Sequence, residues 1–266
     1  MIVIKYGGHA MTDKDGLFAA AIQSTIDMGE QCVIVHGGGP QIDSALQQSG
    51  IKSEFVSGFR VTTPETFTIV QSVLAGEVLR NVVAQLRATG LNAVGLTGRD
   101  GGLVIAKEMT DLPDGSQVNL GRVGEIVRVN PEILLTLLDA GFVPVVAPVG
   151  VKGDELREDS EVGLNINADL VAGAIAGSLS ADTLLFLTDV PGIYANWPDE
   201  SSLIGSITYS DLKTMLSTLS GGMVPKVMAA LKAIELGASN VRVIDGTDPQ
   251  AFALALRGIG GTVVTP

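Results

Sequence analysis

Short β-branched runs alternate with longer helical stretches along most of the chain, and this alternation limits the possible folds more than any other feature. The expected strands are residues 2–6, 32–36, 93–96, 142–146, 183–188 and 241–244. Runs as apolar as these are typical of parallel strands that are buried on both faces. The sequence therefore predicts an α/β fold, a three-layer αβα sandwich with a mostly parallel central sheet.

Helical patterns occupy most of the connections, at residues 14–28, 41–48, 64–88, 131–140, 167–176, 210–219, 224–236 and 249–256. Thr62 and Glu65 have the spacing of a capping box, so we expect Thr62 to cap the helix that begins at Pro64. Two regions of the N-terminal half break the alternation and have the pattern of β-hairpins. They are residues 52–60 and residues 103–129, the latter with a turn at Pro113-Asp114-Gly115.

The charge balance limits the possible ligands. The 266 residues include 17 Lys and Arg against 29 Asp and Glu, a net charge of −12 at pH 7. Bulk charge therefore excludes nucleic acid and anionic membranes as partners, and any anionic ligand must meet a few placed cations. The apolar stretch 170–187 is interrupted by polar residues, which favours a helix, a turn and a strand over a membrane span. We expect a soluble, cytoplasmic protein.

The run His36-Gly37-Gly38-Gly39-Pro40 follows an apolar strand and precedes a helix. Glycines let the backbone approach a ligand closely, and free N–H groups at a helix start favour an anion. Lys5-Tyr6-Gly7-Gly8 closes the first strand, so both turns are expected at the carboxyl edge of the sheet, where α/β proteins bind ligands. The alternatives are a tight turn without a ligand and, for Lys5, a side chain that reaches the surface.

Several further residues are candidates for ligand contacts. Arg60 lies in a loop and suits a carboxylate, although a surface arginine is the simpler interpretation. Asn165 and Asn167 suit a polar substrate and Asp169 could orient lysines, with helix capping by Asn167 and Asp169 as the alternative. Lys226, in the first turn of a helix, opposes the helix dipole, which a bound polyphosphate would offset.

Two common nucleotide-binding motifs and a zinc site are disfavoured. The chain contains neither G-x-G-x-x-G nor G-x-x-x-x-G-K-[ST], which argues against a Rossmann dinucleotide site and a P-loop. The histidines, His9 and His36, lack the spacing of zinc ligands, so we predict no protein-bound metal.

Seven motifs in order resemble the amino acid kinase family, and within it the acetylglutamate kinases, over essentially the whole chain. They are Lys5-Tyr6-Gly7-Gly8, His36-Gly37-Gly38-Gly39-Pro40, Gly58-Phe59-Arg60-Val61-Thr62, Gly121-Arg122-Val123-Gly124-Glu125, Asn165-Ile166-Asn167-Ala168-Asp169, Thr188-Asp189-Val190-Pro191-Gly192 and Gly222-Met223-Val224-Pro225-Lys226. The resemblance implies phosphorylation of the side-chain carboxylate of N-acetyl-L-glutamate by ATP and Mg²⁺, on the way to arginine. The Mg²⁺ would be held mainly by the nucleotide.

The resemblance also assigns roles to individual residues. Gly38 and Gly39 would hold substrate and phosphate through N–H groups, Arg60 the α-carboxylate, and Asn165 the acetamido group. The catalytic set would be Lys5 and Lys226, which stabilise the transferring phosphoryl group, Gly8, which approaches it, and Asp169, which organises both lysines. ATP would contact Asp189, Val190, Pro191, Gly192, Ile193, Tyr194, Thr218, Leu219 and Ser220.

The same resemblance suggests a domain division and an assembly. No linker, charge block or repeat marks a boundary, so we place it near residue 170. Residues 1–170 would form a substrate-binding and dimerisation domain, and residues 171–266 a nucleotide-binding domain. In the family that the chain resembles, arginine-inhibited hexameric members have an extra N-terminal helix. The given chain starts directly at its first strand, so we expect an arginine-insensitive homodimer.

Two departures and two rival functions remain. His9 and Thr63 differ from residues that are common in the family, but neither has a proposed catalytic role. One rival is a sibling kinase that acts on an amino-blocked α-aminoadipate presented by an acidic carrier protein. A chain with a net charge of −12 would repel such a carrier, which disfavours this rival. The other is a non-catalytic regulator, which would be expected to lose Lys5, Lys226 or Asp169.

Overall fold

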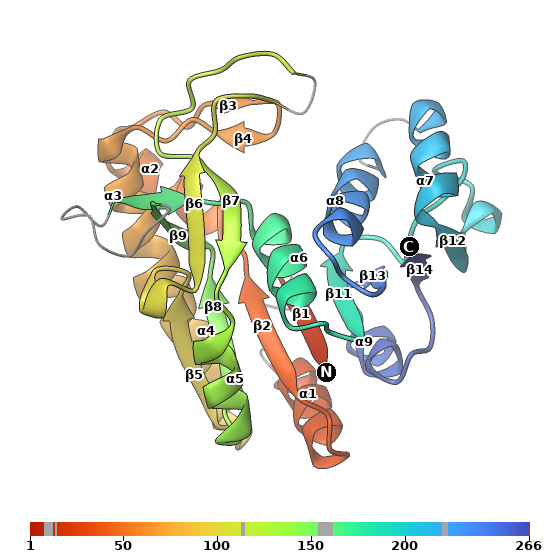
Figure 1. Ribbon diagram of the computed structural model, residues 1–266. Helices are drawn as coiled ribbons and strands as arrows, with labels where there is room; N and C mark the ends of the chain where they lie inside the picture. The colour runs from red at the N-terminus through yellow and green to blue at the C-terminus, as the bar shows by residue number, and fades with distance from the viewer. Residues whose placement is uncertain (8–12, 14, 113–114, 154–161, 220–222) are drawn as a thin grey trace.

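The computed structural model describes residues 1–7, 13, 15–112, 115–153, 162–219 and 223–266. Its main sheet has eight strands in the order β12-β14-β13-β11-β1-β2-β8-β5 (Figure 1). In chain order these strands are β1 (Ile2–Tyr6), β2 (Cys32–His36), β5 (Ala93–Thr97), β8 (Val143–Ala147), β11 (Thr183–Thr188), β12 (Ser206–Thr208), β13 (Val241–Asp245) and β14 (Thr262–Thr265). Every neighbouring pair is parallel except β13 with β14, which confirms the predicted, mostly parallel sheet.

Helices cover both faces of this sheet, as the sequence predicts. They are α1 (Leu17–Asp27), α2 (Gly39–Gln48), α3 (Pro64–Gln71), α4 (Leu79–Ala88), α5 (Glu132–Asp139), α6 (Ala168–Ser178), α7 (Tyr209–Met215), α8 (Met223–Glu235) and α9 (Pro249–Leu256). Alternate strand residues supply two cores, with Ile4 in one and Val3 in the other. Helices α1 to α4 and α9 pack on the first core, and α5 to α8 on the second.

The two irregular regions form antiparallel structure, as expected. Strands β3 (Phe55–Val56) and β4 (Phe59–Arg60) make a hairpin. Strands β6 (Val104–Glu108) and β7 (Gly124–Val129) pair antiparallel in a second, four-stranded sheet with β9 (Val149–Lys152) and β10 (Gly163–Asn165). Figure 1 shows both units above the carboxyl ends of β1 and β2. The predicted turn at Pro113-Asp114-Gly115 falls partly outside the described residues.

The long helix expected at 64–88 is not a continuous α-helix. A π-helical segment, η2 (Ser72–Val78), separates α3 from α4. The combined helix Pro64–Ala88 is long and apolar enough to cross a membrane by length and composition alone. Phe67, Val70 and Leu74 are nevertheless buried in the first core, which accounts for its apolar composition.

The capping prediction was wrong by one residue. Thr63, not Thr62, caps α3, and its hydroxyl oxygen accepts a hydrogen bond from the Thr66 N–H at 3.1 Å. Thr63 has the extended backbone of an N-cap residue (φ −63°, ψ 165°). The hydroxyl of Thr62 instead donates to the carbonyl oxygen of Arg60 at 2.7 Å.

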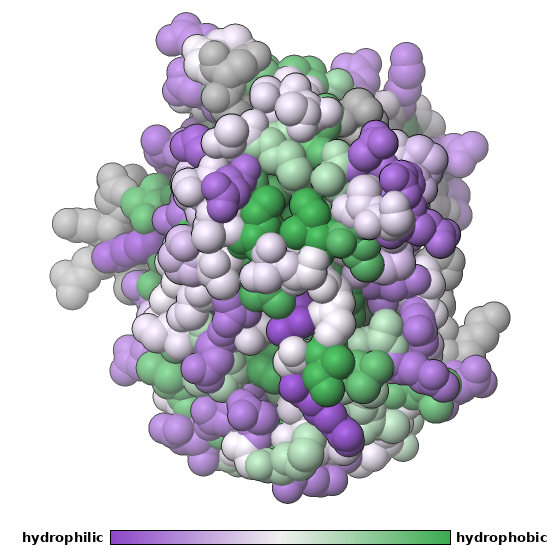
Figure 2. Space-filling model, turned by 90° about the vertical axis from the view of Figure 1, so that its right-hand side faces the viewer, coloured by the Kyte–Doolittle hydropathy of each residue, from purple (hydrophilic) through white to green (hydrophobic). Residues whose placement is uncertain are grey.

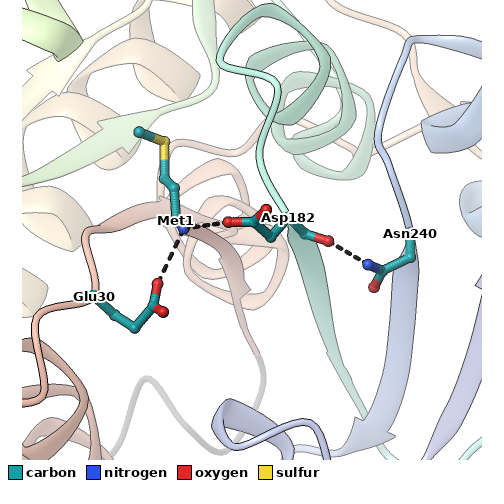
Figure 3. A network of polar contacts seen from close by, with 4 residues as sticks. All are labelled: Met1, Glu30, Asp182 and Asn240. Atoms are coloured by element: carbon teal, nitrogen blue, oxygen red, sulfur yellow. Dashed lines mark hydrogen bonds and ion pairs between the residues drawn. The ribbon is translucent and has the colours of Figure 1, made fainter.

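A polar network joins the sheet strands at the edge opposite the glycine turns. The α-amino group of Met1 lies 2.6 Å from Asp182 Oδ2 and 3.0 Å from Glu30 Oε2 (Figure 3). Asn240 donates a hydrogen bond to the carbonyl oxygen of Asp182. These contacts tie the start of β1 to the turns before β2, β11 and β13. The parallel pairing of β1 with β11 makes the sheet continuous between the two halves of the chain.

The face formed by the C-terminal half is mixed in polarity. Figure 2 shows apolar side chains gathered near the middle of this face, with charged side chains around them. The large apolar side chains that are most exposed in this half of the chain include Trp197, Leu254 and Ile259. The turns that carry the candidate site residues lie instead at the carboxyl edge of the sheet.

Candidate active site

The carboxyl ends of three adjacent parallel strands form the floor of the site. Strands β2, β1 and β11 lie side by side, and they are followed by Gly37, Gly7 and Asp189 respectively. Two neighbouring pockets open at this edge, with volumes of about 340 Å³ and 220 Å³. Both are lined by Lys5 and Asp169, so the two pockets meet at this pair. We call them the glycine pocket and the lysine pocket.

The three glycines of the first turn line the glycine pocket but have different packing. A Cβ atom on Gly38 would lie 2.7 Å from Leu74 Cδ2, whereas a Cβ on Gly37 or Gly39 would meet nothing within 4 Å. Among the three glycines, packing therefore disfavours a side chain only at Gly38. The open space at Gly37 and Gly39 is consistent with a ligand close to the backbone, where the N–H groups at the start of α2 favour an anion.

Arg60 lines the glycine pocket from β4, and only 8% of its surface is exposed. Its Nη1 atom lies 2.5 Å from Asp43 Oδ1 and donates to the hydroxyl of Ser53. The guanidinium lies 4.6 Å from the centre of the Phe55 ring. The hydrogen bond from Arg60 lowers the pKa of the Asp43 carboxyl. A surface arginine is thus excluded, because this guanidinium is buried and oriented beside the pocket.

The two asparagines have different positions. Asn165, on β10, lines the glycine pocket and donates from Nδ2 to the hydroxyl oxygen of Thr62 at 3.2 Å. Asn167 caps α6, and its Oδ1 accepts from the N–H groups of Asp169 at 2.8 Å and Leu170 at 3.3 Å. The capping interpretation is therefore confirmed for Asn167, while Asp169 has a different partner.

That partner is Lys5. Lys5 lies on the same face of β1 as Val3, which packs in the core under α6, and its Nζ atom is 3.2 Å from Asp169 Oδ1. The side chains are 21% and 31% exposed, so the pair is shielded but still reached by solvent. A Cβ on Gly7 would lie 3.1 Å from Lys5 Nζ, so Gly7 leaves room for the ammonium group. Lys5 therefore points into the site rather than to the outer surface.

Lys226, on α8, lines the lysine pocket together with Lys5 and Asp169. Its Nζ atom lies 2.7 Å from Asp189 Oδ1. The lysine side chain is 19% exposed, while that of Asp189 is 74% exposed. The lysine pocket thus holds two ammonium groups, each in contact with a carboxylate.

The overall chain matches a known family along most of its length. The model of the amino acid kinase family covers residues 1–245. The chain belongs to the amino acid kinase family. An acetylglutamate kinase from Paenarthrobacter aurescens (strain TC1) is 46% identical over 275 residues, with 99% of this chain and 86% of the relative covered. One from Nocardia farcinica (strain IFM 10152) is 44% identical over 271 residues, with 100% and 87% covered.

Solved structures share the fold of this amino acid kinase. A Streptococcus mutans UA159 protein superposes with a TM-score of 0.79 at 28% identity, covering 99% of this chain and 98% of the other. N-acetylglutamate synthase from Neisseria gonorrhoeae, complexed with coenzyme A and N-acetyl-glutamate, has a TM-score of 0.81 at 21% identity. The match covers 100% of this chain and 59% of the synthase chain. Carbamate kinase from Giardia lamblia, bound to AMP-PNP, has a TM-score of 0.68 at 19% identity and covers 99% and 97%. The last two likenesses concern the fold alone.

Of the two segments expected to contact the nucleotide, residues 189–194 are largely buried in this amino acid kinase, whereas Thr218 is exposed and Leu219 is half-buried. Val190, Ile193 and Tyr194 pack in the second core, and Gly192 is also buried. Asp189 and Pro191 are exposed. In the second segment, the Thr218 hydroxyl donates to the Met215 carbonyl and Leu219 packs against the second core. Gly8 and Ser220 lie outside the described residues.

Sequence reasoning predicted Asp169 as a partner of Lys5, but it missed the partners of Arg60 and Lys226. Asp43 is 17 positions from Arg60, and Asp189 is 37 positions from Lys226, so local spacing gave no signal for either pair. Asp189 follows a strand at the carboxyl edge, and that position alone could have suggested it as a partner for a cation in the site.

The side chain of His36 contacts the backbone of the first glycine turn. It is fully buried, and its Nδ1 atom lies 2.7 Å from the carbonyl oxygen of Gly37. Because a carbonyl only accepts, Nδ1 carries the proton. Burial lowers the pKa of His36 to about 4, so the ring is neutral at pH 7. Among the described residues, no group of three or more His, Cys, Asp or Glu side chains is arranged to hold a metal ion.

Proposed function

We propose that this amino acid kinase transfers the γ-phosphoryl group of ATP to the side-chain carboxylate of N-acetyl-L-glutamate, a step of arginine biosynthesis. The observation that carries the proposal is the likeness, at 44–46% identity over nearly the whole chain, to proteins named acetylglutamate kinase. The site supports it, because a buried guanidinium lies beside one pocket and two ammonium groups line the next.

The residues suggest how substrate is held in the glycine pocket. Arg60 binds the α-carboxylate, because a planar guanidinium can donate two parallel hydrogen bonds to the two oxygens of a carboxylate. The N–H groups of Gly38 and Gly39 bind the reacting carboxylate and the phosphate. The side-chain amide of Asn165 binds the acetamido group. These contacts place the side-chain carboxylate toward Lys5, which lies between the two pockets.

The reaction requires positioning and charge compensation rather than covalent catalysis. A carboxylate oxygen attacks the γ-phosphorus, the bond to the β,γ-bridging oxygen breaks, and ADP leaves with the electron pair. Negative charge spreads over the transferring oxygens, and Lys5 and Lys226 stabilise it. Asp169 orients Lys5 and contributes to organising both lysines, and Gly8 approaches the phosphoryl group. The contact with Lys226 adds Asp189 to the groups that position the lysines.

ATP and Mg²⁺ fit the chemistry of the lysine pocket. The ammonium groups of Lys5 and Lys226 suit phosphate oxygens, and the exposed carboxylate of Asp189 suits a hydrated divalent cation. When bound with the nucleotide, Mg²⁺ neutralises part of the phosphate charge. The nucleotide itself lies against residues 189–194 and 218–220 of a nucleotide-binding domain, residues 171–266.

The remaining proposals concern organisation. Residues 1–170 form the substrate-binding and dimerisation domain, and the active species is a cytoplasmic homodimer. The resemblance supports these proposals. The position of the glycine pocket, whose lining residues all precede residue 171, supports the assignment of substrate binding to residues 1–170.

One assay tests the proposed activity. The protein is incubated with ATP, Mg²⁺ and N-acetyl-L-glutamate, and the acyl phosphate is trapped with hydroxylamine as a hydroxamate. We expect hydroxamate with N-acetyl-L-glutamate and much less with an amino-blocked α-aminoadipate or with free glutamate. No hydroxamate from N-acetyl-L-glutamate, under conditions in which the protein is folded, would refute the proposal.

A further inference from the structure

Thr62 contacts two residues that line the glycine pocket, Arg60 and Asn165, although Thr62 itself does not line it. Its side chain is fully buried between β4 and α3. Its N–H donates to the Leu120 carbonyl at 2.9 Å, and its carbonyl accepts from the Arg122 N–H at 2.6 Å. The backbone at Thr62 is therefore fixed on both sides, and the hydroxyl occupies a defined position.

The hydrogen bonds of this hydroxyl determine how Asn165 is oriented. Thr62 Oγ1 lies 2.7 Å from the Arg60 carbonyl oxygen and 3.2 Å from Asn165 Nδ2. A carbonyl cannot donate, so the single hydroxyl proton is directed to Arg60. The hydroxyl oxygen can then only accept from Asn165, which must present an N–H group to it. A flipped amide would bring two acceptors together, since Oδ1 would face Thr62 Oγ1.

We propose that Thr62 is a positioning residue, whose hydroxyl fixes the side-chain amide of Asn165 with Nδ2 toward the protein and Oδ1 available to the glycine pocket. The inference rests on the proposed function, in which the substrate is an N-acylated amino acid. An amide oxygen held in this way accepts a hydrogen bond from the substrate N–H. Because the same hydroxyl binds the Arg60 carbonyl, it also couples the two residues that hold the substrate.

The test compares two substrates that differ at one atom. N-acetyl-L-glutamate has an amide N–H, whereas the ester 2-acetoxyglutarate has an oxygen there and cannot donate. The wild-type protein is expected to prefer the amide by about tenfold or more in kcat/KM, because the ester leaves Asn165 Oδ1 without a donor. In Thr62→Val, which keeps the shape but not the hydroxyl, this preference is expected to fall by at least about fivefold.

Thr62→Ser is the matched control, because it keeps the hydroxyl and should retain the wild-type preference. A merely structural role for Thr62 would lower activity with both substrates in proportion and leave their ratio unchanged. An unchanged ratio in folded Thr62→Val therefore overturns the inference. If the wild-type protein phosphorylates neither compound, the proposed function fails instead, and the two failures are distinguishable.

A second variant keeps the test decisive if Thr62→Val does not fold. In Asn165→Asp, a carboxyl group can donate to Thr62 Oγ1 only when it is protonated. The kcat/KM of this variant for N-acetyl-L-glutamate is therefore expected to rise, relative to the wild-type protein, as the pH falls from 7 toward 5. A pH profile parallel to that of the wild-type protein would overturn the inference, because it would mean that the hydroxyl donates to residue 165.

Discussion

The two pockets at the carboxyl edge use their cations in different ways. In the glycine pocket, Arg60 is 8% exposed and is held by Asp43, Ser53 and the Phe55 ring. In the lysine pocket, the side chain of Lys226 is 19% exposed, and its partner carboxylate is 74% exposed, against 48% for Asp43. Solvent weakens an ion pair of this kind, so an incoming phosphate can compete for the lysine. The difference indicates that the glycine pocket is organised for binding and the lysine pocket for transfer.

The largest expected effect comes from removing a transfer cation. Lys226→Met is expected to lower kcat by about 10²–10³-fold, because stabilisation of the transition-state charge is lost. The KM for N-acetyl-L-glutamate should stay within about threefold of the wild-type value. Steady-state kinetics at saturating ATP measure both. Lys232→Met, on the exposed side of α8, is the matched control and should leave kcat and KM unchanged.

Removing the binding cation should have the opposite signature. Arg60→Met is expected to raise the KM for N-acetyl-L-glutamate by about 10–100-fold, because a charge-assisted contact is lost, with a smaller change in kcat. Arg87→Met, at the exposed end of α4, serves as the control. A fall in kcat at unchanged KM in Arg60→Met would remove the distinction between the two pockets.

His36 offers a test through pH. The unfolded chain protonates this histidine near pH 6.5, whereas the folded protein does so only near pH 4. Protons bound by the unfolded state alone reduce stability, so the wild-type protein loses stability as the pH falls below about 6.5. In His36→Asn, which keeps a donor at the Nδ1 position, the loss between pH 7 and 5 should be smaller by about 2 kcal/mol. Urea unfolding at both pH values measures it, and equal losses would contradict the buried, neutral ring.

The smallest effect separates packing from binding within one glycine turn. Gly38→Ala is expected to destabilise the protein by about 1–2 kcal/mol, because its Cβ would approach Leu74 in the first core. Gly39→Ala meets no atom within 4 Å and should leave the thermal midpoint almost unchanged while raising the KM for N-acetyl-L-glutamate. Equal changes in thermal midpoint for both variants would show that packing does not distinguish these glycines.

Sequence patterns predicted the parts of the fold that depend on consecutive residues. The strands Ile2–Tyr6, Cys32–His36 and Thr183–Thr188 have the predicted bounds, because each is a continuous run of mostly apolar residues. The strands Ser206–Thr208 and Thr262–Thr265 were missed, since they are short and lie at or next to a sheet edge. Local pattern is therefore a strong signal for the central strands and for β5 at one edge, and a weak one for the two short strands at the other edge.

The site was predictable as a set of residues but not as a set of contacts. Lys5, Arg60 and Asn165 stand out because each is a polar residue in or near an apolar run or a glycine turn. The partners of Arg60 and Asn165 were not predictable, because they are distant in sequence. Thr62 and Asn165 are 103 positions apart, and they meet because both make backbone hydrogen bonds to residues 120–122. Likewise, Thr62 and Thr63 have the same side chain, and only the backbone decides which one caps α3.

Calorimetric binding of N-acetyl-L-glutamate without ATP tests the division between the pockets most directly. The dissociation constant is measured for the wild-type protein, Arg60→Met and Lys226→Met. Weakening by about tenfold or more in Arg60→Met, with a change below about threefold in Lys226→Met, is the predicted result. Equal weakening in both variants would contradict the separation of binding from transfer.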